Sequence, residues 1–73
     1  MSEFNAAEMA KRIRVKRVEH GMTQQQLDVE AGIGCGMVAR YESAETIPGV
    51  DKLWRLAETL QVTPGWLMGQ EAV

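Results

Sequence analysis

Cysteine and histidine, the residues best suited to catalysis in this sequence, occur once each. A Cys35 thiolate with His20 as its base would need a third group to orient the base, and the sequence offers none. A single cysteine excludes an internal disulfide, and the pair gives no metal-binding set. The sequence also lacks a phosphate-binding glycine loop. We therefore expect no enzymatic activity, no metal and no cofactor.

The segment around Cys35 is better suited to binding. Residues 34–40 read Gly-Cys-Gly-Met-Val-Ala-Arg. The fork of donors on Arg40 can bind two acceptors on a guanine edge, Met37 can contact a thymine methyl, and Gly36 lets the backbone approach closely. A thiol near a helix start can also serve as a redox sensor; the alternative is that Cys35 is only a small tolerated residue. The candidate base contacts are Cys35, Gly36, Met37, Ala39 and Arg40.

Two short helices that meet at a bend would present this segment. Thr23 and Gln26 form a capping box that begins the earlier helix of this pair, over 23–31. Gly32 suits the left-handed bend, and a second helix over 34–42 follows. Apolar residues at spacings that suit packing across the bend are Leu27, Ala31, Ile33, Val38 and Tyr41. This pattern is typical of a helix-turn-helix, whose second helix enters the DNA major groove.

Three further helices are predicted around this pair. Asn5 caps a helix over 6–20, in which His20 would complement the helix dipole. Pro48-Gly49 opens a helix over 50–61, and Thr63 caps one over 64–69. The expected buried stripe of 50–61 is Val50, Leu53, Trp54, Ala57 and Leu60. The sequence thus predicts an all-α, compact five-helix bundle, a single domain over 1–73 with its core in 6–69. Trp54 and Trp66 would face that core, the alternative being that they stack on bases.

Composition restricts the partners. The chain has 73 residues, 45% hydrophobic and 25% charged, with net charge −2. Five of the eight basic residues lie in 11–17, where they form either a DNA-contacting face or an ordinary solvated one. No apolar run is long enough to span a membrane, and no secretory signal precedes the first helix. We expect a cytoplasmic, bacterial or phage-encoded protein that does not bind membranes.

The order of these motifs resembles the Cro/CI-like (XRE) helix-turn-helix family, especially the DNA-binding domains of lambdoid phage repressors. The resemblance covers residues 9–69. It rests on RIRVKR at 12–17, GMTQQQL at 21–27, the apolar frame of 27–41 ending in Glu42, LWRLAETLQV at 53–62 and TPGWLMG at 63–69.

The resemblance implies roles for individual residues. Arg17 and Glu42 would form an ion pair that joins the first helix to the end of the recognition helix. The DNA phosphate contacts would come from Thr23, Gln24, Arg17 and Ser43. The last helix would form a dimer interface through Pro64, Trp66, Leu67 and Met68. Such dimers place their recognition helices about 34 Å apart and read a palindrome in double-stranded DNA.

The sequence departs from the family pattern in three places. The start of the recognition helix lacks the usual polar side chains, so direct base readout depends on Arg40. The loop at 43–47 has one acid and no base. Asp28 stands where alanine is typical, and our hypothesis is that it accepts amides at the start of the third helix, where Gly34 has no side chain to do so. The alternative is that Asp28 tilts to solvent.

The first function hypothesis is a sequence-specific DNA-binding transcriptional regulator, a phage or prophage-type repressor that binds a short palindrome as a homodimer. One alternative is a protein-interaction module that kept the fold and lost base readout. The other is an antitoxin-type regulator that binds both DNA and a toxin. The net charge, the acidic loop and the Gly-Cys-Gly-Met segment fit the protein-interaction module.

Overall fold

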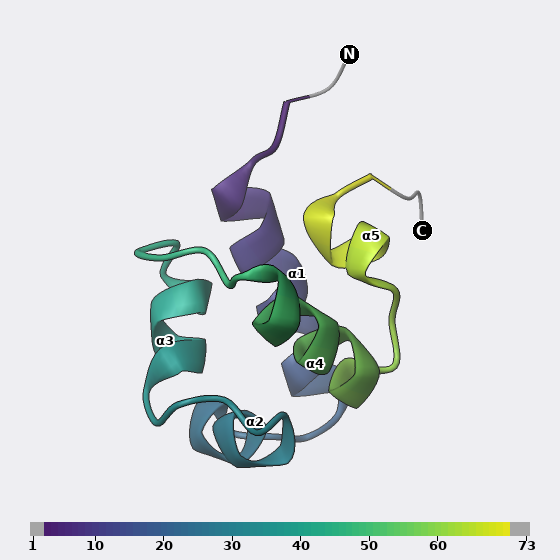
Figure 1. Ribbon diagram of the computed structural model, residues 1–73. Coiled ribbons are helices and arrows are strands. Elements are labelled where there is room, and N and C mark those ends of the chain that lie inside the picture. The colour runs from purple at the N-terminus through teal and green to yellow at the C-terminus, as the bar shows by residue number, and fades with distance from the viewer. Residues whose placement is uncertain (1–2, 71–73) are drawn as a thin grey trace.

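The computed structural model describes residues 3–70, which contain five helices and no strand. The helices are α1 (Ala6–Glu19), α2 (Gln24–Glu30), α3 (Met37–Glu42), α4 (Val50–Leu60) and α5 (Pro64–Met68). In Figure 1, α1 and α4 cross at the centre, α2 and α3 lie on one side of them, and α5 lies on the other. The prediction of an all-α bundle is confirmed, and its helices fall within the core range expected from the sequence.

Side-chain caps begin three of these helices as predicted. The Asn5 side chain accepts the Glu8 amide at 3.0 Å, and the Thr63 hydroxyl accepts the Trp66 amide at 3.0 Å. At Thr23 both halves of the capping box form, with its hydroxyl 3.0 Å from the Gln26 amide and its own amide 2.7 Å from the Gln26 side-chain oxygen. Each cap satisfies amides that have no partner within the helix, so these short helices start at defined residues.

The third helix begins later than the sequence predicted. It starts at Met37, and its N-cap is Gly36, with φ +83°. Cys35 and Gly36 therefore lie in the turn before the helix and not on it. Gly34 and Gly36 let the backbone of this turn adopt a non-helical path. The hydrogen bonds that a helix would supply here are replaced by bonds to an acceptor on α2, the Asp28 carboxylate. A pattern of apolar residues cannot reveal such a replacement.

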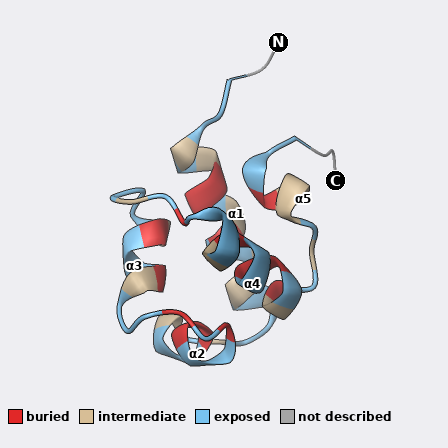
Figure 2. Ribbon diagram, in the orientation of Figure 1, coloured by how far each residue is buried: buried red, intermediate tan, exposed pale blue. Residues whose placement is uncertain are grey.

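The core lies where the five helices meet (Figure 2). Its fully buried side chains are Ile13, Leu27, Val38, Leu56, Leu60 and Leu67. The stripe expected on α4 was partly wrong, because Val50 is 84% exposed and Trp54 60% exposed. The buried face of α4 contains Leu56 together with Leu53, Ala57 and Leu60, which rotates Val50 and Trp54 to its outer edge.

Cations on α1 hold α5 in place. The Arg12 guanidinium lies 4.8 Å and the Lys16 ammonium 5.2 Å from the centre of the half-buried Trp66 ring. Arg12 also donates to the Trp66 carbonyl oxygen at 2.6 Å. At the other end of α1, the His20 ring lies 2.9 Å from the Leu60 carbonyl oxygen, so it contacts the end of α4 rather than only its own helix. None of the helices within residues 3–70 is long and apolar enough to cross a bilayer.

Candidate nucleic-acid interface

The turn between α2 and α3 is set by a left-handed glycine. Gly32 has φ +68° and donates to the Val29 carbonyl, and the Ile33 amide donates to the Asp28 carbonyl at 3.0 Å. This reversal turns the Ile33 side chain into the core, where it is 8% exposed. The apolar contacts expected across the bend therefore form.

Burial raises the pKa of the Tyr41 hydroxyl on α3, with Asp51 and Asp28 adding to the shift, so this core phenol stays neutral.

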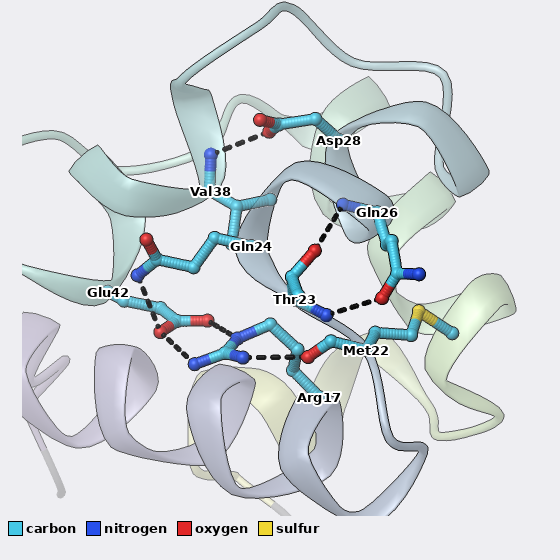
Figure 3. A network of polar contacts seen from close by, with 8 residues as sticks. All are labelled: Arg17, Met22, Thr23, Gln24, Gln26, Asp28, Val38 and Glu42. Atoms are coloured by element: carbon cyan, nitrogen blue, oxygen red, sulfur yellow. Dashed lines mark hydrogen bonds and ion pairs between the residues drawn. The ribbon is translucent and has the colours of Figure 1, made fainter.

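An ion pair between Arg17 on α1 and Glu42 on α3 joins these helices, and further hydrogen bonds connect the pair to Met22 and to Gln24 on α2 (Figure 3). The Arg17 Nε lies 2.6 Å from Glu42 Oε2, and its Nη2 lies 3.0 Å from Oε1. Arg17 also donates to the Met22 carbonyl at 2.8 Å, and the Gln24 amide donates to Glu42 at 3.1 Å. The side chains of Arg17 and Glu42 are only 14% and 4% exposed. The hydrogen bond to Glu42 raises the pKa of Arg17 against the opposing effect of burial, so the guanidinium stays charged.

This network decides which polar residues remain available to a ligand. Arg17 uses three of its nitrogens within the fold and is nearly covered, so we leave it out of the proposed phosphate contacts. Thr23 is exposed, but its hydroxyl and amide are used by the capping box. Gln24 is half-buried, and its amide nitrogen contacts Glu42. Ser43 is exposed and donates to the Arg40 carbonyl at 3.0 Å.

Asp28 supplies the missing acceptor at the start of α3. Its two carboxylate oxygens accept the Gly36 amide at 2.8 Å and the Val38 amide at 2.9 Å. The residue is 4% exposed, so the alternative of a solvent-facing carboxylate is wrong. The hypothesis that it caps the third helix is confirmed, although the cap residue it serves is Gly36 instead of Gly34. The carboxylate thereby fixes the backbone on both sides of Met37.

The predicted base-contact residues lie together on the outside of this frame. Four of them are exposed, and Met37 is half-buried against the core. Cys35 is a free, exposed thiol. Arg40 is the only one with a charged side chain, and it forms an ion pair with Glu45, whose Oε2 lies 3.4 Å from Arg40 Nε. This contact could not be predicted from helical spacing, because Glu45 lies in the turn after α3 and is brought next to Arg40 by that turn.

The basic run of the first helix does not form one free positive face. Arg12 and Lys16 lie against Trp66, and Arg17 is paired with Glu42. Lys11 and Arg14 are exposed. The structure therefore divides the run between packing and solvent, and α3 carries its own exposed positive charge in Arg40.

The residues expected at a dimer interface are not equally accessible. Leu67 is fully buried within the protomer, where it packs in the core. Pro64 and Trp66 are half-buried, and Met68 is 36% exposed. An outer surface of α5 could therefore present Pro64, Trp66 and Met68, with Leu67 supporting it from beneath. Within residues 3–70, no group of three or more His, Cys, Asp or Glu side chains is arranged to hold a metal ion.

Solved structures with the same fold include two of the P22 c2 repressor. A crystal structure of that repressor with a synthetic operator has a TM-score of 0.81 and 28% identity, and the match covers 86% of this chain and 96% of that one. The solution structure of the P22 c2 DNA-binding domain has a TM-score of 0.80 and 29% identity, covering 93% and 91%. The restriction-modification controller protein C.AhdI from Aeromonas hydrophila, at 22% identity with coverage of 85% and 94%, has a TM-score of 0.79, which shows the fold alone.

A comparison with curated protein sequences gives no match. The sequence does match the helix-turn-helix family over residues 13–67, which is most of the chain and includes both α2 and α3. The capping box, the left-handed glycine and the Arg17–Glu42 pair all lie inside the matched range. This protein therefore belongs to the helix-turn-helix family of the Cro/CI-like (XRE) type.

Proposed function

We propose that this protein is a sequence-specific DNA-binding transcriptional regulator of the phage-repressor type, which binds a short palindrome as a homodimer. The observation that carries the proposal is the outer face of α3. Its exposed Arg40 projects from a helix that Asp28 and Glu42 fix at both ends. Family membership and the likeness to the operator-bound P22 c2 repressor support DNA as the ligand.

In this proposal the helix-turn-helix enters the major groove and α3 meets the base edges. Arg40 binds a guanine through its two terminal nitrogens, Met37 meets a thymine methyl, and Gly36 allows close approach. Cys35 and Ala39 complete the surface against the bases. Thr23, Gln24 and Ser43 lie at its margin as the proposed phosphate contacts. A dimer bound over a promoter represses transcription by occluding it.

Replacing Arg40 by alanine is the direct test. A selection of bound sites from a random DNA library first defines the preferred sequence, and fluorescence anisotropy then compares the variants on it. Loss of one bidentate arginine–guanine contact, worth about 1–3 kcal/mol, should weaken binding about 5- to 150-fold and relax the preference at one base pair. Arg14→Ala, which removes an exposed arginine from α1, is the matched control. Equal losses in both variants, or a selection without a preferred sequence, would contradict base readout by Arg40.

The proposed dimer has two candidate surfaces, and substitutions separate them. We place the contact on α5, where Met68→Lys should raise the dimer dissociation constant on the order of tenfold or more, because a lysine buried without a partner is costly. Trp54→Gln on α4 should leave it unchanged. Sedimentation velocity measures both. The opposite result would move the contact to the apolar edge formed by Val50 and Trp54.

That exposed edge of α4 is also the specific observation in favour of the second candidate function, a protein-interaction module. Trp54 is 60% exposed and Val50, one turn before it on α4, is 84% exposed, and an exposed apolar patch is a feature of protein-contact surfaces. This second function requires no DNA preference. A library selection that yields a defined sequence lost in Arg40→Ala would exclude it as the main role.

A further inference from the structure

The chain reverses immediately after α3 in a turn that glycine usually makes. The Ala44 amide donates to the Tyr41 carbonyl at 3.1 Å, and the Glu45 amide donates to the Arg40 carbonyl at 3.0 Å. These two bonds define a Schellman turn, in which Ala44 is the left-handed residue with φ +62°. Left-handed backbone costs alanine about 1 kcal/mol more than glycine. The turn is therefore fixed by its hydrogen bonds and not by a favourable residue.

This turn brings residue 45 back over residue 40. In many such turns the residues at these two positions make an apolar contact. Here they are Arg40 and Glu45, and Arg40 Nε lies 3.4 Å from Glu45 Oε2. Both side chains are more than half exposed, and the backbone holds their starting points together through the Glu45 amide. The carboxylate is therefore placed beside the guanidinium by the main chain, before any ligand arrives.

We propose that Glu45 is a positioning residue that makes Arg40 selective for guanine. The carboxylate takes the Nε side of the guanidinium. The two terminal nitrogens make no hydrogen bond to any residue within 3–70, and they are the pair that binds the two acceptors of a guanine edge. The carboxylate also repels a phosphate that approaches Arg40 from the same side. This inference rests on the proposed DNA-binding function.

The physical consequence is a trade between affinity and selectivity. An exposed pair of this kind contributes little in the free protein, because water screens it. Water is excluded where Arg40 meets a base edge, so the electrostatic interaction of a guanidinium held in one orientation is stronger there. Glu45 should therefore weaken binding to DNA of any sequence while favouring the site that carries the guanine. This also gives a role to the acid in a loop that lacks the basic residues usual in the family.

The test compares Glu45→Gln with Glu58→Gln, which removes the same charge from an exposed position on α4. Anisotropy titrations use three duplexes: the selected site, the same site with its guanine pair changed to adenine, and a random sequence. Glu45→Gln should raise affinity for the random duplex about two- to fivefold at low salt. It should lower the ratio between the guanine and adenine sites about three- to tenfold, whereas Glu58→Gln should leave that ratio unchanged.

Arg40→Ala separates failure of this inference from failure of the proposed function. If Arg40→Ala lowers the guanine-to-adenine ratio and Glu45→Gln does not, the positioning role is overturned and base readout stands. If neither variant changes the ratio, base readout by Arg40 itself is overturned. In the double variant, Glu45→Gln should have no further effect on the ratio; a remaining effect would mean that Glu45 acts other than through Arg40. Circular dichroism confirms that each variant is folded.

Discussion

Replacing Arg17 by alanine should destabilise the protein by about 3–5 kcal/mol, the cost of leaving a buried charge without its partner. Glu42 is 4% exposed and would keep only the Gln24 amide as a donor. The Met22 carbonyl would lose its guanidinium as well. Native proteins have a total free energy of unfolding of about 5–15 kcal/mol, and a domain this small should lie toward the lower end of that range, so Arg17→Ala should lose a large part of its stability.

Urea denaturation followed by circular dichroism at neutral pH measures this effect. Arg14→Ala is the control, since it removes the same charge from an exposed site and should change the free energy of unfolding by less than about 0.5 kcal/mol. The raised pKa of Arg17 means that the stability gained from its own protonation is fully present below the ordinary arginine pKa and is lost as pH rises through the raised pKa. A loss under about 1 kcal/mol for Arg17→Ala would show that the pair is not a structural link.

Asp28→Ala should cost about 2–3 kcal/mol, although alanine is the better helix former. The variant removes the acceptor of two amides, and a hydrogen bond to a charged group contributes about 1.5–3 kcal/mol. The greater part should come from Val38, whose amide is buried, because water can replace the carboxylate at the exposed Gly36. Unchanged or increased stability would overturn the capping role.

Asp28→Asn provides the graded control. Its side-chain oxygen can accept one amide, but its nitrogen would face the other, so we expect an intermediate loss of stability. Hydrogen exchange at the Val38 amide gives a local readout, and it should accelerate in both variants. Because the carboxylate also fixes the backbone on either side of Met37, both variants should weaken selective DNA binding even at temperatures where they remain folded. A variant with normal exchange and lower stability would place the effect elsewhere.

Three contacts from different parts of the fold hold the outer face of α3 in place. Glu42 anchors the end of α3 to α1, Asp28 anchors its start to α2, and the turn at Ala44 sets Glu45 beside Arg40. The sequence analysis expected the first from the family resemblance and the second from the residue type at position 28. The third follows from the path of the backbone alone.

The number and order of the helices, their side-chain caps and the packing across the α2–α3 bend could be predicted from the sequence alone. Those features depend on residues close together in the chain, such as Thr23 with Gln26, or on apolar spacing that repeats every helical turn. The pairing of Arg17 with Glu42 was available only through the family resemblance, since nothing local specifies it.

Three features depend on the packing of the helices: where α3 begins, which cations of α1 stay free and which residues of α4 face solvent. The helix starts at Met37 because the Asp28 carboxylate on α2 accepts the Gly36 and Val38 amides on either side of it. Arg12 and Lys16 are not free because they lie over the Trp66 ring. Trp54 is exposed because the neighbouring helices cover only one narrow face of α4. Each outcome depends on contacts between groups that are distant in sequence. The periodicity of apolar residues along the chain does not specify such contacts.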